Sequence, residues 1–439
     1  MNKFKISSTQ TIFGSFLLTI FVGAFLLMLP ISSNSGQPTN FLTCLFTSTS
    51  SLCVTGLVLV DTATHWSFFG QLIILILIQI GGLGVFVVIS IIFIFMGQKM
   101  NIVQRSTLQE SLSIDKVGGI IKLILFIIKI VASFELAGAV LLFFQFIKDF
   151  NLPTAIWYSV FHSISAFCNA GFDLMGVRGE FSSLTTYQSN ILVNLTLMLL
   201  IVFGGLGFYV WNDITNKKFK FNKYKLQSKL VIITTIFLIL IPTVYFFFFE
   251  YKDLTMRPRI LSSLFQSITT RTAGFNTANF NEMSEVGKAI SIMLMLIGGS
   301  PGSTAGGMKT TTFATLLIST FAVYKRYNEP HIFNRRIEIQ IIKNAITIFM
   351  MYLNLFLIAG FVICKIEDVS LMEALFETAS AIGTVGLTLG ISAGLSEVSQ
   401  ILLMLLMFLG RVGGLTFIYS IIPSIDKEAG YISENIAVG

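Results

Sequence analysis

Charged residues are scarce in this chain of 439 residues: they make up 12% of it, while hydrophobic residues make up 54%. Soluble domains carry about 25% charged residues, so this composition excludes an ordinary soluble protein. Cysteine and histidine are also rare, at four and three residues, and neither a CxxC pair nor an HExxH motif occurs. These shortages argue against a metal centre, a disulfide framework and an intramembrane catalytic group. We therefore predict that the chain is not an enzyme, has no organic cofactor and uses its cysteines as reduced apolar side chains.

Long apolar runs are abundant in the sequence. A helix needs about 20 apolar residues to cross a membrane. Runs of this kind lie near residues 11–30, 70–97, 120–147, 189–211, 230–249, 285–324, 344–364 and 396–420. They predict an all-α polytopic membrane protein with eight transmembrane segments. No small-residue cleavage site follows the first run, which we therefore expect to be retained as a span.

Lysine and arginine are spread unevenly between the predicted loops. The two chain ends and the loops after the even-numbered spans hold more than twice as many of them as the loops after the odd-numbered spans. The positive-inside rule then places both termini in the cytoplasm. The net charge of +7 is thus explained by topology. We predict contacts with membrane lipids or a cytosolic partner, and none with nucleic acid.

Four short segments, each between an odd and an even predicted span, share one pattern. Each begins with Phe, carries small hydroxyl residues through its middle and ends at a glycine followed by a large apolar residue. The segments end at Gly56, Gly171, Gly274 and Gly386, and a second glycine cluster follows each of them, at 81–84, 204–207, 298–307 and 410–414. They are too short to span a membrane and too apolar for exposed loops, which predicts re-entrant helices that end in loops at membrane depth. A unit that recurs four times predicts modules around one axis. The predicted repeats are 1–110, 111–229, 230–335 and 336–439.

The glycines have a mechanical reason to stand at the ends of these segments. Carbonyl oxygens that point together into a narrow pore often require left-handed backbone, which glycine adopts without a steric penalty. Four such loops would surround a desolvated K⁺ with rings of carbonyls, and the half-helices would direct their negative C-terminal ends at it. An ordinary helix C-cap explains one such glycine but not four in register. The predicted K⁺ selectivity filter consists of Val54, Thr55, Gly56, Asn169, Ala170, Gly171, Thr272, Ala273, Gly274, Thr384, Val385 and Gly386.

Five motifs carry a family resemblance. They read TSTSSLCVTGLVLVDT (47–62), HSISAFCNAGFDL (162–174), QSITTRTAGFNT (266–277), GGSPGSTAGGMKTTT (298–312) and ASAIGTVGLTLG (379–390). With these motifs the chain resembles the membrane subunits of the Trk/Ktr/HKT superfamily of potassium transporters, and it looks like the shorter bacterial Ktr type. The resemblance implies four M1–pore-loop–M2 repeats in a pseudo-fourfold arrangement around one pore, a homodimer in the bacterial plasma membrane, and a cytosolic ring of nucleotide-binding regulatory subunits. In that family a serine in place of the first filter glycine goes with Na⁺ transport, and this chain has Gly56 there.

The sixth predicted span contains the segment GGSPGSTAGGMKT at 298–310. It differs from a phosphate-binding P-loop because Met308 separates Gly307 from Lys309, so we do not expect nucleotide binding there. Its glycine, serine and proline residues break the helix, and the resemblance implies an intramembrane gate. A basic residue at mid-membrane costs about 2.5–3.5 kcal/mol. Lys309 and Arg411 therefore face the pore constriction or, as an alternative for Lys309, snorkel to the inner surface. The predicted gate consists of Gly298, Gly299, Ser300, Pro301, Gly302, Ser303, Thr304, Ala305, Gly306, Gly307, Lys309 and Arg411.

These features predict uptake of K⁺ across the plasma membrane. The resemblance further implies that uptake is stimulated by Na⁺ and gated by the interrupted span under control of the regulatory subunit. Four acidic residues near the predicted outer mouth either concentrate cations or have structural roles: Asp61, Asp173, Glu373 and Glu377. One alternative function is a Na⁺-permeable or weakly selective transporter of the same fold. Another is a membrane scaffold that binds regulators without conducting ions.

Overall fold

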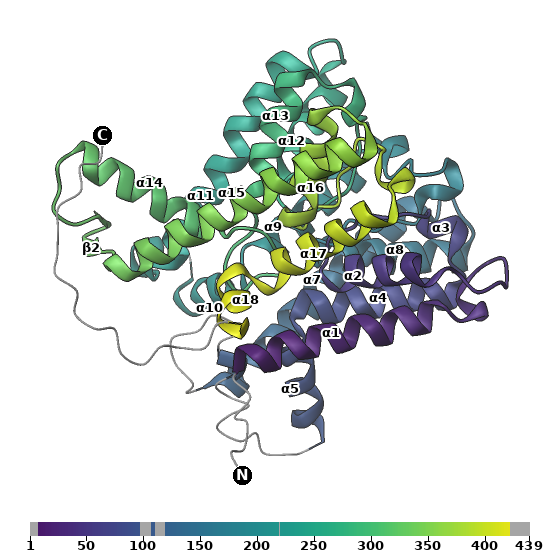
Figure 1. Cartoon of the computed structure of the whole chain (residues 1–439), viewed down its shortest axis with the longest axis horizontal. Helices are drawn as coiled ribbons and strands as arrows, with labels where there is room; N and C mark the ends of the chain where they lie inside the picture. Colours follow the sequence, from purple (N-terminus) through teal and green to yellow (C-terminus); the bar gives the residue numbers. More distant parts are fainter. Residues whose placement is uncertain (1–7, 97–106, 110–118, 219, 422–439) are drawn as a thin grey trace.

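The computed structural model describes residues 8–96, 107–109, 119–218 and 220–421. Helices make up almost all of its regular structure (Figure 1). Within the described ranges the only sheet is the hairpin of β1 (His331–Ile332) and β2 (Arg335–Arg336). The four cysteines are free thiols. The prediction of a helical protein with several long apolar helices is confirmed.

The helices follow one another in four similar groups. Each group contains a long apolar helix, a short helix that ends in a glycine-containing loop, and a further helix that is interrupted and then resumes. The first group consists of α1 (Ser8–Leu27), α2 (Phe41–Leu52), α4 (Phe68–Leu83) and α5 (Val85–Phe95), and the second of α7 (Ile120–Phe146), α8 (Leu152–Phe167), α9 (Ile191–Gly205) and α10 (Phe208–Lys217). The third consists of α11 (Leu226–Tyr245), α12 (Met256–Thr269), α13 (Glu285–Leu296) and α14 (Thr310–Tyr324), and the fourth of α15 (Ile339–Glu367), α16 (Leu371–Gly383), α17 (Glu397–Val412) and α18 (Gly414–Ile421). The short helix α3 (Thr62–His65) follows the first glycine loop.

The long helices are apolar enough to face lipid. Four helices in the described part of the chain are long and apolar enough to cross a membrane: α1, α7, α15, and α11 with its π-helical end (Phe246–Glu250). The pairs α4–α5 and α9–α10 are each bent by 94° and raise that number to six if each pair is one span. Leu136, Phe237 and Ile358 on the long helices are more than half exposed, as a lipid-facing surface requires. The sixth and eighth predicted spans are divided into shorter helices, of 12 and 15 residues in α13 and α14 and of 16 and 8 residues in α17 and α18.

Glycine defines three of the four interruptions. Gly84, Gly207 and Gly413 separate the paired helices and have φ of 90°, 91° and 92°. This left-handed region is open to glycine and unfavourable for other residues. In the third group the break is instead the whole segment 297–309, between α13 and α14. A single left-handed glycine thus interrupts the helix in the first, second and fourth groups, and a longer loop interrupts it in the third group.

A hydroxyl at one position fixes three of the short helices to their long neighbours. Ser48 of α2, Ser163 of α8 and Ser267 of α12 donate to main-chain carbonyls of α1, α7 and α11 at 2.7, 2.6 and 2.7 Å. Gly23 and Gly138 make room for the first two contacts, because a Cβ atom on either would collide with the serine hydroxyl. Since buried hydroxyls need partners, these bonds fix the position of each short helix along its neighbour.

Some predictions about organisation fall partly outside the described residues. The predicted boundary at 110/111 lies outside them, while that at 229/230 falls inside α11 and that at 335/336 inside β2. Several basic residues used for the predicted topology also lie outside them: Lys3, Lys5, Lys99, Arg105, Lys116 and Lys427.

Candidate functional site

The four predicted filter glycines form a closed ring. A Cβ atom built on any of them would lie closer than 3.0 Å to the main chain of another loop, which leaves no space for a side chain. The contacts run in chain order and close from the fourth loop to the first: Gly56 faces the carbonyl of Ala170, Gly171 that of Ala273, Gly274 that of Val385, and Gly386 that of Thr55. The structure therefore brings the four loops together around a ring of main-chain atoms.

The same backbone conformation recurs in all four loops. The residue two positions before each glycine has a left-handed φ between 50° and 65°, although none of these residues is glycine: Val54, Asn169, Thr272 and Thr384. The glycines follow with φ of 92°, 71°, 77° and 92°. A non-glycine residue in this region costs roughly 1–2 kcal/mol, and such strain persists only where the surrounding structure holds it. Because the conformation is shared and the side chains differ, the loops present their backbone to the ring.

Hydroxyl groups of the short helices hold the loops in two different ways. In the first and fourth loops the glycine N–H donates to a serine, and in the second and third a hydroxyl donates to the carbonyl of the phenylalanine after the glycine. The four loops therefore have the same backbone conformation but two kinds of supporting hydrogen bond, one in the neighbouring first and fourth loops and the other in the neighbouring second and third loops. The bonds are Gly56 N to Ser50 Oγ (3.1 Å), Gly386 N to Ser380 Oγ (3.0 Å), Ser165 Oγ to Phe172 O (2.7 Å) and Thr269 Oγ1 to Phe275 O (2.6 Å).

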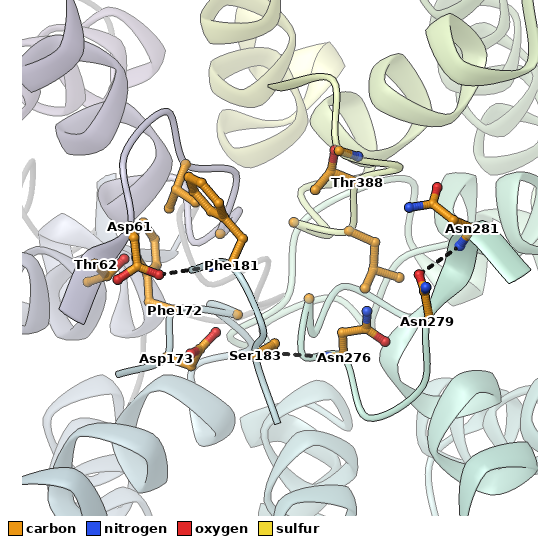
Figure 2. Close-up of a pocket in the computed structure, with 17 residues that line it drawn as sticks. Asp61, Thr62, Phe172, Asp173, Phe181, Ser183, Asn276, Asn279, Asn281 and Thr388 are labelled. Carbon is orange, nitrogen blue, oxygen red and sulfur yellow. Dashed lines mark hydrogen bonds between the residues drawn. The ribbon is translucent and has the colours of Figure 1, made fainter. Parts of the chain in front are cut away.

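A cavity of about 280 Å³ opens on one side of the ring (Figure 2). All four filter glycines line it, together with Asp61, Asp173, Asn276, Asn279 and Asn281. Among the residues that the structure describes, no lysine, arginine or histidine lines it. Figure 2 shows the two carboxylates on one side of the cavity and the three asparagines toward the other. A cavity with this distribution of charge attracts cations.

The predicted topology places this cavity outside the membrane, and it is called the outer cavity below. Its two carboxylates have different surroundings. Asp61 accepts from two N–H groups at the start of α3, and its other oxygen accepts from the Phe181 N–H at 3.1 Å. It therefore joins the chain after the first filter loop to the chain after the second. Asp173 accepts from the Met175 N–H at 2.9 Å. Burial raises the pKa of Asp173 to about 6, the Met175 N–H opposes this rise and the neighbouring Asp61 carboxylate adds to it.

The other two acidic candidates do not line the outer cavity. Glu373 forms a capping box with Ser370 at the start of α16, a structural role. Glu377 is buried within α16 and accepts from the hydroxyls of Thr388 and Ser392. Of the four candidates, Asp61 and Asp173 are thus the two that face the cavity.

The predicted gate segment lies on the other side of the ring from this cavity. The Thr304 hydroxyl donates to the carbonyl of Phe167 at 3.0 Å and lies 3.2 Å from the side-chain amide of Asn169. Gly306 packs directly against the Thr384 hydroxyl. Asn169 and Thr384 lie at the ends of the short helices α8 and α16, two residues before the filter glycines Gly171 and Gly386. The segment therefore contacts the inner end of two filter loops.

Main-chain hydrogen bonds hold the segment in place from two helices. Ser300 and Thr304 donate to carbonyls at the end of α9 at 3.0 and 3.3 Å. Gly307 donates to the carbonyl of Gly410 in α17 at 3.1 Å. A loop packed among helices needs such partners because an unpaired buried main-chain group is costly.

Arg411 links the gate segment to the first group of helices. Its guanidinium donates to the Thr304 carbonyl and to the carbonyls of two glycines at the end of α4. Lys309 donates from Nζ to the Ala305 carbonyl at 2.7 Å, inside its own segment. Both basic residues line a second cavity of about 250 Å³, which shares no lining residue with the outer one. Lys309 thus bonds within its own segment at the wall of this cavity.

Two kinds of residue at this site escaped prediction. The hydroxyl anchors are one kind, although a signal was present: the hydroxyl stands six residues before the glycine in three loops and five before it in the third. The other is Arg271, a buried residue next to the left-handed Thr272, whose Nε has no hydrogen-bond partner among the described residues. Arg271 lines a small cavity with Asn169 and Gly299. A single arginine in a polar motif does not indicate in the sequence that its side chain will be buried beside the filter loops.

The chain is similar to known proteins over nearly its whole length. Residues 7–428 match the TrkH family, described as cation transport protein. The chain is 37% identical to the potassium/sodium uptake protein NtpJ of Enterococcus hirae, over 97% of this chain and 96% of that protein. It is 35% identical to the Ktr system potassium uptake protein B of Bacillus subtilis, over 99% and 97%. The crystal structure of the potassium transporter TrkH from Vibrio parahaemolyticus has the same fold, with a TM-score of 0.75 at 17% identity over 96% of this chain and 87% of that one.

Proposed function

The chain belongs to the TrkH family of cation transport proteins, and from this premise we propose that it takes up K⁺ across the bacterial plasma membrane. It is a multi-pass membrane protein of a transporter family, and relatives that match its full length are named for potassium uptake. The observation that carries the proposal is the closed ring of four glycine loops at the base of a cation-attracting cavity. Rings of backbone carbonyls can replace the hydration shell of K⁺.

The proposed layout has eight transmembrane segments in four M1–pore-loop–M2 repeats around one pore, with both termini in the cytoplasm. The fourfold recurrence of the same element order supports this layout. So does the order of the glycine contacts, which pass from each loop to the next and back to the first. The bent and interrupted helices then provide the second span of each repeat.

The proposed filter uses backbone carbonyls of the three residues that end in each glycine. Its support is the shared left-handed conformation across different side chains. K⁺ is the transported ion in this proposal, and Na⁺ is an activator or co-ion. The name potassium/sodium uptake protein of a relative 37% identical to this chain favours Na⁺ permeation as the second candidate function.

The proposed gate is the segment 298–307 with Lys309 and Arg411. The segment contacts the inner ends of two filter loops through Thr304 and Gly306. Arg411 holds it to the first repeat by charge-assisted hydrogen bonds, which are stronger than neutral ones. Movement of this segment away from the filter would open a path for ions from the filter to the second cavity, which Lys309 and Arg411 line. Deleting it is expected to raise K⁺ flux, and unchanged flux would contradict the gate.

We further propose a homodimer that works with a cytosolic nucleotide-binding regulatory subunit and contacts anionic lipids through its basic cytoplasmic loops. The names of relatives as parts of a Ktr system support a partner subunit. The basic loops after the even-numbered spans support the lipid contacts.

Complementation tests the proposed function. The chain is expressed in bacteria that lack their own K⁺ uptake systems, and growth and initial uptake rates are measured at low external K⁺ with and without Na⁺. We expect rescue of growth and faster uptake of K⁺ than of Na⁺. Equal rates for the two ions would favour the weakly selective alternative. No rescue by protein that is present in the membrane would contradict the proposal and favour a scaffold. The Gly56→Ser variant serves as control, since it is expected to lower the K⁺/Na⁺ ratio.

A further inference from the structure

The four short helices carry different polar residues at one equivalent position. It lies one helical turn before the hydroxyl that anchors each filter loop, and it is occupied by Thr47, His162, Gln266 and Glu377. All four side chains are buried. Because the position is the same and the chemistry differs, these residues can support the four loops unequally.

Glu377 is bonded to the chain that leaves the fourth filter loop. The Thr388 hydroxyl donates to its Oε1, and the Ser392 hydroxyl lies 3.1 and 3.0 Å from its two oxygens. Thr388 in turn accepts from the Gly390 N–H at 2.9 Å, and it lines the outer cavity two residues after Gly386. A buried carboxylate thus fixes the exit of this loop.

His162 has the corresponding contact in the second repeat. Its Nδ1 lies 2.7 Å from the Tyr158 carbonyl and therefore donates, which leaves Nε2 to accept from the Leu174 N–H at 3.2 Å. Leu174 stands three residues after Gly171, on the exit of the second loop. The imidazole also packs near the ring of Phe275 in the third loop, with 6.5 Å between ring centroids.

The other two residues at this position make no short hydrogen bond with the chain that leaves their loops. Thr47 donates to the carbonyl of Thr43 in its own helix at 2.9 Å. Gln266 has only a 3.9 Å contact with Met283 Sδ, and its Oε1 has no partner among the described residues. Since the glycine contacts run in chain order around the ring, the second and fourth loops lie opposite each other. The two exits that are held by a residue at this helix position are therefore on opposite sides of the ring, whereas the chains after the first and third loops are held by contacts of Asp61 and Asn276 with the chain after the second loop.

We propose that His162 and Glu377 are positioning residues of the filter, which set its preference for K⁺ over Na⁺ by tethering the exits of two opposite loops. The filter backbone is strained before each glycine, and a loop that loses the bond between its exit and its own short helix can relax that strain. Any relaxation changes the distance between carbonyls across the ring, on which ion discrimination depends. This inference rests on the proposed K⁺ uptake.

Matched substitutions test it through the ratio of initial K⁺ and Na⁺ uptake rates in cells that lack their own uptake systems. Glu377→Leu and His162→Phe remove the acceptor and keep the approximate volume, and the K⁺/Na⁺ ratio is expected to fall about tenfold in each. Glu377→Gln keeps a carbonyl oxygen for the hydroxyls, so a smaller fall is expected. Thr47→Val and Gln266→Met at the equivalent position are the controls, with ratios within about twofold of the parent chain.

An unchanged ratio in Glu377→Leu and His162→Phe, at normal amounts in the membrane, overturns the inference. An equal fall in the two controls also overturns it, because it would show a general packing effect. If Glu377→Leu does not reach the membrane, the double variant Thr388→Val, Ser392→Ala removes the same bonds from the other end and has the same expected ratio. The parent chain is measured alongside: no K⁺ uptake by it contradicts the proposed function, whereas normal uptake with unchanged variants contradicts this inference alone.

Discussion

The filter loops and the helix breaks both contain glycines with a left-handed backbone, but their surroundings differ. Gly56 in the first filter loop has φ of 92° and Gly84 in the first helix break has φ of 90°. A Cβ atom on Gly56 would collide with the carbonyl of Ala170, whereas one on Gly84 would meet no atom of the described residues within 4 Å. In the filter, glycine is therefore required by both conformation and close packing. At Gly84 in the first helix break, glycine is required by the backbone conformation alone.

The two regions also differ in how uniform they are. All four filter loops have the same conformation and the same kind of contact with the next loop. Among the breaks, Gly207 packs against Pro301 of the gate segment, and the third break is the segment 297–309 itself. A ring that coordinates one ion benefits from equal loops, while a gate requires at least one element that can move separately. The predictions below test this division, beginning with the largest expected effect.

Gly56→Ala and Gly84→Ala separate packing from conformation, since both glycines have nearly the same φ. We expect Gly56→Ala to lower K⁺ uptake roughly 100-fold or more, because main-chain atoms of the ring cannot move aside for the new methyl group. Gly84→Ala should keep uptake within about threefold of the parent chain, with a loss of stability from its backbone alone. Uptake rates and membrane amounts of both variants measure this. Equal loss in the two variants would show that conformation alone governs both regions.

Arg411→Gln tests the proposed movement of the gate segment. The substitution removes charge-assisted hydrogen bonds between the gate segment and the first repeat, and bonds to charged groups contribute about 1.5–3 kcal/mol each. We expect K⁺ flux without the regulatory subunit to rise roughly tenfold. Lys309→Met is the matched control, because the bonds of Lys309 with described residues lie within its own segment, and it should change flux less. A fall in flux for Arg411→Gln, with normal amounts in the membrane, contradicts the proposed gate.

Ser50→Ala and Ser165→Ala test whether the filter is built as two pairs of loops. Ser50 accepts from the Gly56 N–H, so its loss leaves a buried donor without a partner. Ser165 donates to a carbonyl, and a carbonyl tolerates a lost bond better than an N–H does. We expect the K⁺/Na⁺ uptake ratio to fall about tenfold for Ser50→Ala and about threefold for Ser165→Ala. The reverse order would show that the two kinds of support are not what distinguishes the pairs.

External pH is expected to have the smallest effect, through Asp173. With a pKa of about 6, this carboxyl is charged at neutral pH and becomes neutral as the pH falls below 6. Its negative charge then no longer concentrates cations in the outer cavity. We expect the KM for K⁺ to rise about two- to threefold between about pH 7.5 and about pH 5. In Asp173→Asn the KM should be high and independent of pH, while Glu373→Gln, outside the cavity, should keep the parent profile. A pH dependence that persists in Asp173→Asn assigns the titration to another group.

The sequence was sufficient for the helical class, the four glycine loops and the position of the break between α13 and α14, because these depend on local patterns, while the roles of filter and gate stay predictions. Apolar runs identify the long helices, and a glycine at one position of a recurring motif identifies the ring. The number of uninterrupted spans was harder to predict: a glycine inside an apolar run does not reveal that α4–α5 bends by 94°.

The partners in individual contacts between distant segments could not be predicted. The sequence groups Arg411 with the gate segment, but nothing local to Arg411 specifies its bonds to the Thr304 carbonyl and to the end of α4. The direction of the hydroxyl bonds was equally hidden, because a serine can either donate or accept. Ser50 and Ser165 occupy equivalent positions, yet one accepts from a glycine and the other donates to a phenylalanine. The role of Asp61 also depends on a contact with Phe181 in another repeat.

The central claim is that four equivalent glycines of one chain form the ion-selective ring. The most direct test replaces each glycine by serine in turn and measures the K⁺/Na⁺ uptake ratio of the four single variants, which are Gly56→Ser, Gly171→Ser, Gly274→Ser and Gly386→Ser. We predict that every variant loses K⁺ preference, by factors that agree within about threefold. If only one of the four changes the ratio and the others transport K⁺ as the parent chain does, the ring is not the selective element.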